Sequence, residues 1–140
     1  MKVLITGGAG FIGSYLAENY LEQGDDVYIV DDLSTGTLEN IKHLQVDENH
    51  KDKLFVTIDS ILNHNVMLGL VGTCDIVLHM AAAVGVQYIL ENPLSSIVTN
   101  IKGAEEVLEL CNKFKKKVLI ASTSEVYGKH THAPLVETDN

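Results

Sequence analysis

Short apolar runs alternate with longer amphipathic stretches along the whole chain. Runs of four or five apolar and often β-branched residues are typical of strands that are buried on both faces. We predict five such strands, at residues 2–6, 27–30, 54–58, 75–79 and 117–121. Apolar residues at helical spacing predict helices over 11–21, 38–44, 61–70 and 93–114, with a loop at 45–53 and a polar tail over 128–140.

The helix over 93–114 has the clearest start signal. Pro93 occupies the first helical position, where its missing N–H costs nothing, and Asn92 precedes it as the predicted cap. Strands that alternate with helices are joined by right-handed crossovers into a parallel sheet. The pattern therefore predicts one α/β domain over residues 1–140, built on a single open, doubly wound sheet.

The charge balance and the short apolar runs exclude several classes of partner. The chain contains ten lysines, 19 acidic residues and no arginine, which gives a net charge of −9. Nucleic-acid backbones are held by clustered basic residues, so nucleic-acid binding is disfavoured. The lysine cluster within 113–117 is interpreted as a helix C-terminus and a solvated loop. With no apolar run near the ~18 residues of a membrane helix and no visible secretory signal, we expect no membrane partner and a cytoplasmic location.

The cysteines and the paired histidines predict no metal site. Cys74 and Cys111 lack the spacing of a metal or redox site, so we expect both to be reduced and at least half buried. His130 and His132 form a pair without a third ligand nearby. No metal is therefore expected.

A glycine-rich segment follows the first predicted strand and opens the first predicted helix. Gly8, Gly10 and Gly13 form a Gly-x-Gly-x-x-Gly pattern, and Gly7 precedes them. Glycines at these offsets permit a tight turn and a close approach of the backbone to a pyrophosphate. The helix N-terminus then offers free N–H groups and a positive dipole end to the phosphates. The segment predicts a dinucleotide-binding turn, in preference to a plain strand-to-helix connection.

Asp31 ends the second predicted strand, 18 residues after Gly13. An acid about 20 residues beyond the glycines binds the adenosine ribose hydroxyls in dinucleotide-binding folds. A carboxylate repels a 2′-phosphate, and no arginine is present to attract one, so NAD is favoured over NADP. Asp31 has an alternative role as a turn cap, for which Asp32 is the better candidate.

Two other strand ends carry polar residues. His79 ends the fourth strand, and we favour a packed histidine there over a catalytic base. After the fifth strand, the segment 122–128 holds three hydroxyls and a carboxylate, which form either a hydrogen-bonded turn or a reaction centre. Because the carboxyl ends of parallel strands share one sheet edge, the second interpretation gains weight from the glycine-rich segment.

These motifs together resemble the extended short-chain dehydrogenase/reductases, and within them the NAD-dependent nucleotide-sugar epimerases, dehydratases and decarboxylases. The matching segments are 6–13, 31–36, 79–82 and 122–128. The resemblance implies a Rossmann-like sheet of strand order 3-2-1-4-5 and a tightly bound NAD. It also implies a UDP- or dTDP-linked sugar substrate that is transiently oxidised at C4. It further implies a homodimer or other self-association, formed in the family through the helix over 93–114 and a later helix that these residues lack.

The resemblance also implies which residues meet the cofactor. Those expected to line the pyrophosphate are Gly7, Gly10, Phe11, Ile12 and Gly13. Those expected around the adenosine ribose are Asp31, Asp32, Ser34 and Thr35, with Asp59 and Ser60 beside the adenine. Those expected to follow the rest of the cofactor are Met80, Ala81, Ala82, Val84, Asn100 and Ser122.

The reaction itself is assigned by the same resemblance to the segment after the fifth strand. Thr123 matches the position that hydrogen-bonds the reacting hydroxyl, while Ser124 and Glu125 match positions that vary with the reaction. A Ser-Glu pair is more typical of decarboxylases and epimerases than of dehydratases.

One family feature is absent from these 140 residues. None of the five tyrosines has a lysine four residues later, so the family's Tyr-x-x-x-Lys acid/base pair is missing. We expect a chain truncated before the later strands and the substrate subdomain, inactive alone and prone to self-association through its uncovered fifth strand. Three alternatives remain open: a catalytically silent NAD-binding module, one half of a split enzyme, and a flavodoxin-like domain for another phosphate ligand.

Overall fold

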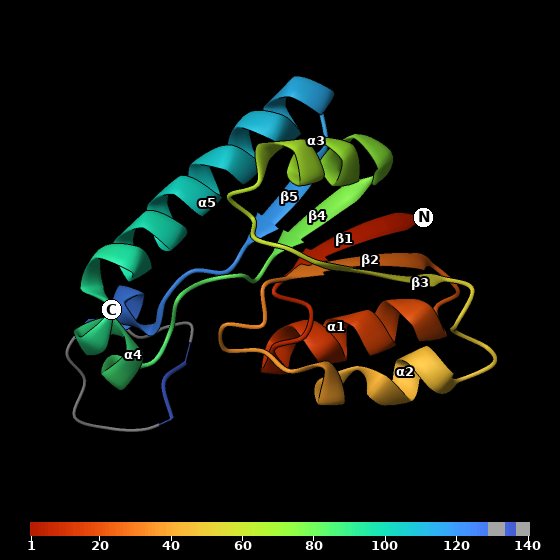
Figure 1. The fold of residues 1–140 in the computed structure, drawn as a ribbon, viewed down its shortest axis with the longest axis horizontal. Helices are drawn as coiled ribbons and strands as arrows, with labels where there is room; N and C mark the ends of the chain where they lie inside the picture. Colours follow the sequence, from red (N-terminus) through yellow and green to blue (C-terminus); the bar gives the residue numbers. More distant parts are fainter. Residues whose placement is uncertain (129–133, 137–140) are drawn as a thin grey trace.

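A five-stranded parallel sheet forms the centre of the computed structural model, which describes residues 1–128 and 134–136 (Figure 1). Its strands are β1 (Lys2–Thr6), β2 (Asp26–Asp31), β3 (Leu54–Ile58), β4 (Ile76–His79) and β5 (Lys117–Ile120). Their order is β3-β2-β1-β4-β5, and every pairing is parallel. The predicted fold class and strand order are therefore confirmed.

Helices cover the two faces of this sheet in pairs. On one face lie α1 (Phe11–Glu22) and α2 (Lys42–Val46), and on the other α3 (His64–Thr73) and α5 (Pro93–Phe114) (Figure 1). Alternate residues of β1 serve the two cores: Val3 and Ile5 pack in the α1–α2 core, and Leu4 in the α3–α5 core. All three are fully buried, as an apolar strand with both faces covered requires.

The predicted helices differ from the observed ones at their ends. The helix expected over 38–44 is divided into a 3-10 turn η1 (Leu38–Asn40) and α2. The one expected from 61 begins three residues later, because Asn63 caps it by accepting a hydrogen bond from the amide of Val66. Asn92 does not cap α5 with its side chain, because the side-chain Nδ2 donates to the Tyr88 carbonyl instead. No pattern in the sequence predicted α4 (Val86–Glu91) or the 3-10 turn η2 (Ser124–Tyr127).

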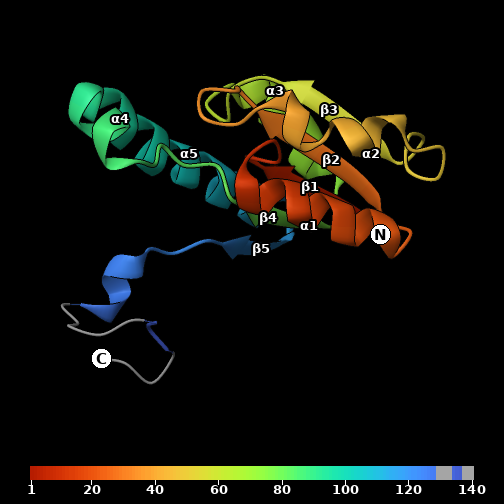
Figure 2. The same ribbon diagram turned by 90° about the horizontal axis from the view of Figure 1, so that it is seen from below.

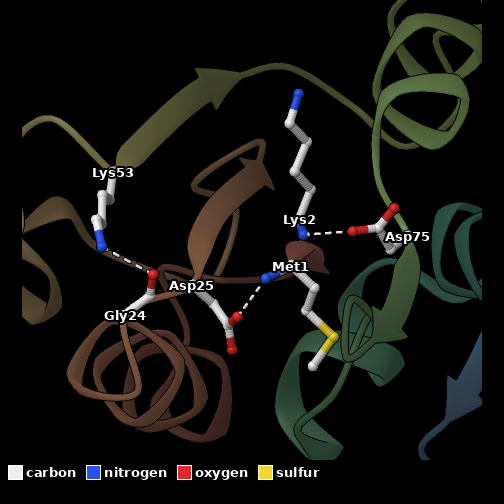
Figure 3. A network of polar contacts seen from close by, with 6 residues as sticks. All are labelled: Met1, Lys2, Gly24, Asp25, Lys53 and Asp75. Atoms are coloured by element: carbon white, nitrogen blue, oxygen red, sulfur yellow. Dashed lines mark hydrogen bonds and ion pairs between the residues drawn. The ribbon is translucent and has the colours of Figure 1, made fainter.

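The amino-terminal ends of the strands are joined by polar contacts (Figure 3). The Met1 ammonium pairs with Asp25, which raises the pKa of that ammonium. The amide of Lys2 donates to Asp75 at 2.7 Å, and the Lys53 ammonium donates to the Gly24 carbonyl at 2.8 Å. These contacts fix the turns at this edge of the sheet and leave the opposite edge for the glycine-rich segment.

Both cysteines are free and buried, as expected. Burial raises the pKa of Cys74 to about 12 and also raises the pKa of Cys111. Within residues 1–128 and 134–136, no cluster of three potential metal ligands and no helix able to span a membrane is found. His130 and His132 lie outside the described residues.

Candidate functional site

The glycine-rich segment forms the tight turn between β1 and α1. Gly7 lies in the left-handed region at φ +69°, and a Cβ there would be 2.8 Å from the backbone of Ala81. At Gly13 a Cβ would be 2.2 Å from the Gly7 carbonyl oxygen. The turn, the strand and the helix therefore approach so closely that neither position has room for a side chain.

Gly10 differs from these two glycines. It has an ordinary extended backbone, with φ −79° and ψ 177°, which any residue adopts. A Cβ there would meet one atom within 4 Å, the Gly7 carbonyl oxygen at 3.2 Å. A Cβ at Gly10 therefore needs only a small shift of the Gly7 carbonyl, and strains the fold less than a Cβ at Gly7 or Gly13.

The first turn of α1 offers unpaired amides beside Gly10. Within the described part of the chain, the amides of Phe11, Ile12 and Gly13 have no acceptor, and the first helical bond runs from Ser14 to the Gly10 carbonyl at 3.0 Å. The N-cap contributes no side-chain bond, and no acidic residue lies in the first turn. A positive helix end without a protein anion is a suitable site for phosphate groups.

Asp31 is buried, with 8% of its surface exposed, at the carboxyl end of β2. Its Oδ2 accepts the amide of Ala9 in the glycine-rich turn, and its Oδ1 accepts the amide of Leu33, each at 2.9 Å. Asp32 accepts the amide of Ser34, also at 2.9 Å. Both acids thus support local turns, where the sequence favoured Asp32 alone. Each oxygen of Asp31 retains acceptor capacity for a ribose hydroxyl.

The residues predicted beside the adenine lie next to this acid. The amide of Asp59 donates to the Asp31 carbonyl at 3.1 Å. The Asp59 carboxylate accepts the amide of Ser60 at 2.7 Å, and the Ser60 hydroxyl accepts the amide of Leu62 at 3.2 Å. Ser34 and Thr35 are exposed. The structure therefore gathers the predicted adenosine-binding residues at the ends of β2 and β3.

The end of β4 packs against the glycine-rich turn through Thr6. The Thr6 hydroxyl accepts the amide of Ala81 at 3.1 Å and lies 2.8 Å from Nδ1 of His79. Burial lowers the pKa of His79, so its ring is neutral at neutral pH. The hydroxyl can donate to Nδ1 or accept from Nδ1–H, and in both tautomers this 2.8 Å contact joins the neutral ring to the end of β1. His79 is a packed residue, the interpretation that the sequence favoured.

The chain is expected to lose stability as the pH falls below the ordinary histidine value near 6.5. Because the folded-state pKa of His79 is lowered, the unfolded chain takes up a proton there before the folded chain does. Replacing His79 with asparagine, whose Oδ1 takes the place of Nδ1, should remove this part of the pH dependence. Unfolding in urea at pH 7.5 and at pH 5.5 measures the stability that the unaltered chain and the variant each lose between these two values. Equal losses of stability in both proteins would contradict the prediction.

The segment after β4 is fastened to α5. Asn100 accepts the amide of Ala83 at 2.7 Å and donates to the carbonyl of the same residue at 3.2 Å. Two bonds to one residue hold the segment over the carboxyl edge of the sheet. Met80 and Ala81 are half-buried there, while Ala82 and Val84 are exposed.

The candidate catalytic segment lies at the same sheet edge but apart from the glycine-rich turn. The amide of Ala121 donates to the His79 carbonyl at 3.2 Å, which aligns the end of β5 with that of β4. Ser122 and Thr123 are exposed, and Ser124 and Glu125 begin η2. Figure 2 shows this segment leading away from α1 and the sheet. The structure therefore does not bring residues 122–125 against the turn, and their catalytic roles stay predictions.

Sequence reasoning missed one group of residues that contact the glycine-rich turn. The amide of Thr37 and the side chain of Asn40 both donate to the Ala9 carbonyl, at 3.1 and 2.8 Å. A contact between residues 31 positions apart leaves no trace in apolar periodicity, and no motif spacing indicated it.

The sequence is similar to proteins that are named as enzymes of nucleotide sugars. The sequence model described as GDP-mannose 4,6 dehydratase matches residues 4–140. The UDP-N-acetyl-alpha-D-glucosaminuronate decarboxylase of Bacillus cytotoxicus is 43% identical over 139 residues, which are 99% of this chain and 41% of that protein. A putative UDP-glucose 4-epimerase of Methanocaldococcus jannaschii is 34% identical, over 96% of this chain and 42% of that protein. The chain thus spans about two fifths of the length of these relatives.

Solved structures share the fold. A UDP-glucose-4-epimerase from Stenotrophomonas maltophila, with bound NAD and formylated UDP-arabinopyranose, superposes with a TM-score of 0.83 at 30% identity, covering 99% of this chain and 41% of that one. The UDP-glucose 4-epimerase of Thermus thermophilus in complex with NAD gives a TM-score of 0.79 at 30% identity, over 99% and 43% of the two chains.

Proposed function

Because the chain belongs to the family described as GDP-mannose 4,6 dehydratase, we propose that residues 1–140 form the NAD-binding domain of an enzyme that acts on nucleotide sugars. Relatives named as nucleotide-sugar decarboxylases and epimerases support the enzyme class, and NAD in similar solved structures supports the cofactor. The single observation that carries the proposal is the set of unpaired amides at Phe11, Ile12 and Gly13 beside the open position of Gly10.

The residues of this edge fit NAD part by part. The free amides of α1 donate to the pyrophosphate, and the helix end stabilises its charge. Asp31 accepts from the ribose hydroxyls, and its carboxylate opposes the 2′-phosphate of NADP. Asp59 and Ser60 border the adenine, with Asp32, Ser34 and Thr35 around the ribose. The remaining contacts in the proposal come from Met80, Ala81, Ala82, Val84, Asn100 and Ser122.

The proposed reaction begins at C4 of a UDP- or dTDP-linked sugar. Bound NAD would supply the hydride acceptor for this oxidation and the hydride donor for the later reduction. Thr123 hydrogen-bonds the reacting hydroxyl, and Ser124 and Glu125 occupy the positions that vary with the reaction. Several relatives are named as UDP-glucuronic acid decarboxylases, in agreement with the Ser-Glu pair, so decarboxylation of a UDP-uronate is the first candidate and epimerisation the second.

The proposal includes self-association and a cytoplasmic location. Leu94, Ile97 and Ile101 on α5 are 74%, 57% and 63% exposed, and Leu119 on the edge strand β5 is 52% exposed. Such apolar surface is typical of an interface with a second copy.

The proposed cytoplasmic location is supported by the free, buried thiols of Cys74 and Cys111, which are typical of a reducing compartment.

Light scattering at tens of micromolar protein is expected to give a mass of at least two chains. Ile101→Glu should reduce this mass, because it places a charge in the exposed apolar face of α5. Asn112→Glu adds the same charge at an exposed polar position of that helix and should leave the mass unchanged. A strictly monomeric unaltered chain would argue against the predicted interface.

The proposed function is tested by the nucleotide that the protein carries. Mass spectrometry of denatured, freshly purified chain is expected to release NAD and not NADP. Incubated with UDP-glucose and UDP-glucuronate, residues 1–140 are expected to leave both sugars unchanged, since Tyr-x-x-x-Lys is absent from them. Release of a different nucleotide would refute the assignment of the cofactor, and turnover would refute the need for that pair.

A further inference from the structure

Three hydrogen bonds join the backbone of Ala9 to one other segment of the chain, residues 31–40. Its amide donates to Oδ2 of Asp31 at 2.9 Å. Its carbonyl accepts from the backbone amide of Thr37 at 3.1 Å and from Nδ2 of Asn40 at 2.8 Å. Ala9 itself is fully buried, and it lies directly before Gly10 and the free amides of α1.

The two segments approach so closely at Gly36 that a Cβ there would displace the Ala9 backbone. A Cβ there would be 3.0 Å from the carbonyl carbon and oxygen of Ala9 and 3.1 Å from Oδ1 of Asp31. The segment 31–40 is therefore packed directly onto the glycine-rich turn. The acid proposed for the ribose and the turn proposed for the pyrophosphate are joined into one unit.

Asn40 is the side chain in this contact that has no other evident purpose. The residue is exposed, and within the described residues its side chain makes one hydrogen bond, the one to the Ala9 carbonyl. Its amide reaches a loop that lies 31 residues earlier in the sequence. A surface asparagine bonded to a buried backbone carbonyl of a ligand-binding turn is better explained by positioning of that turn than by stabilisation of the core.

We propose that Asn40 is a positioning residue of the dinucleotide site, which holds the Ala9 carbonyl so that the amides of Phe11 and Ile12 stay directed at the pyrophosphate. This inference rests on the proposed function, because it takes the ligand to be a dinucleotide. Without the bond from Asn40, the turn samples conformations in which the amides of Phe11 and Ile12 no longer point at the same place. Binding of the dinucleotide must then restore their arrangement, which lowers the affinity.

Asn40→Ala is expected to weaken binding of NAD, and of ADP as a smaller pyrophosphate probe, by about fivefold, the affinity equivalent of one net hydrogen bond. Amide hydrogen exchange at Ala9 and Gly10 should become faster, while the amide of Gly7, which donates to the Val30 carbonyl at 2.8 Å, should keep its protection. Asn19→Ala is the matched control, because Asn19 is an asparagine on α1 that bonds the Gln23 side chain, away from the turn.

Gly36→Ala tests the same contact from a second position and should reproduce both effects, because its Cβ displaces the Ala9 backbone. Unchanged NAD affinity in Asn40→Ala, with the unaltered chain binding NAD normally, would overturn this inference alone. Weaker binding with unchanged exchange at Ala9 and Gly10 would also overturn it, because Asn40 would then contact the ligand directly. An unaltered chain that binds no NAD would overturn the proposed function and this inference together.

Discussion

Gly10→Val is expected to abolish measurable NAD binding in a chain that remains folded. The backbone of Gly10 is extended, and a Cβ would meet the Gly7 carbonyl oxygen at 3.2 Å and no other atom within 4 Å. The branched side chain would instead occupy the space from which a pyrophosphate reaches the amides of Phe11 and Ile12. Loss of two charge-assisted hydrogen bonds, at about 1.5–3 kcal/mol each, weakens binding by about a hundredfold or more.

Gly13→Ala provides the contrasting control. A Cβ at Gly13 would be 2.2 Å from the Gly7 carbonyl oxygen and 2.7 Å from the Gly8 Cα, so α1 must move away from the turn. We expect this variant to lose about 3 kcal/mol of unfolding free energy, the upper part of the range for overpacked sites. Calorimetric titration with NAD measures the loss of binding in Gly10→Val, and unfolding in urea measures the loss of stability in Gly13→Ala. Normal NAD affinity in Gly10→Val would contradict the proposed phosphate site.

Asp31→Asn is expected to lower both NAD affinity and stability. The two carboxylate oxygens accept the amides of Ala9 and Leu33, and an asparagine turns one of these acceptors into an N–H group. A buried amide that faces another donor costs about 1–3 kcal/mol. NAD affinity should fall about tenfold or more, because the ribose loses a charged acceptor and the turn loses an anchor. The preference for NAD over NADP should shrink, since the repelling charge is gone.

Asp32→Asn is the matched control for this variant. Asp32 is exposed and accepts one backbone amide, that of Ser34, which the asparagine Oδ1 can accept equally well. Its stability should stay close to that of the unaltered chain, and its NAD affinity should fall less than that of Asp31→Asn, because the bond to the Ser34 amide is kept. If both variants change the NAD-to-NADP ratio equally, Asp31 has no special role in ribose recognition.

The sheet and its glycine-rich turn were predictable from the sequence because both leave strong local signals. Buried parallel strands appear as continuous apolar runs, and the turn needs glycine at Gly7 and Gly13 for steric reasons. The helix at Pro93–Phe114 was predicted with its observed bounds, because proline marks its start and apolar periodicity extends throughout its length.

The features that were missed leave no local signal in the sequence. The helix α4 spans six residues at the carboxyl edge of the sheet, beside the start of α5, and its exposed apolar residues Ile89 and Leu90 give no core-facing pattern (Figures 1 and 2). The bonds from Asp31 and Asn40 to Ala9 arise only when residues 31–40 pack against the turn. The segment after β5 leads away from the sheet (Figure 2), because motif order fixes the end of the strand but not the direction of the chain beyond it.

Calorimetric titration of the folded, nucleotide-free chain with NAD tests the proposed dinucleotide site most directly. We expect saturable heat with one NAD per chain, much weaker binding of NADP, and no saturable heat in Gly10→Val. A well-folded chain that gives no heat with NAD, or that binds NADP as tightly as NAD, would contradict this assignment.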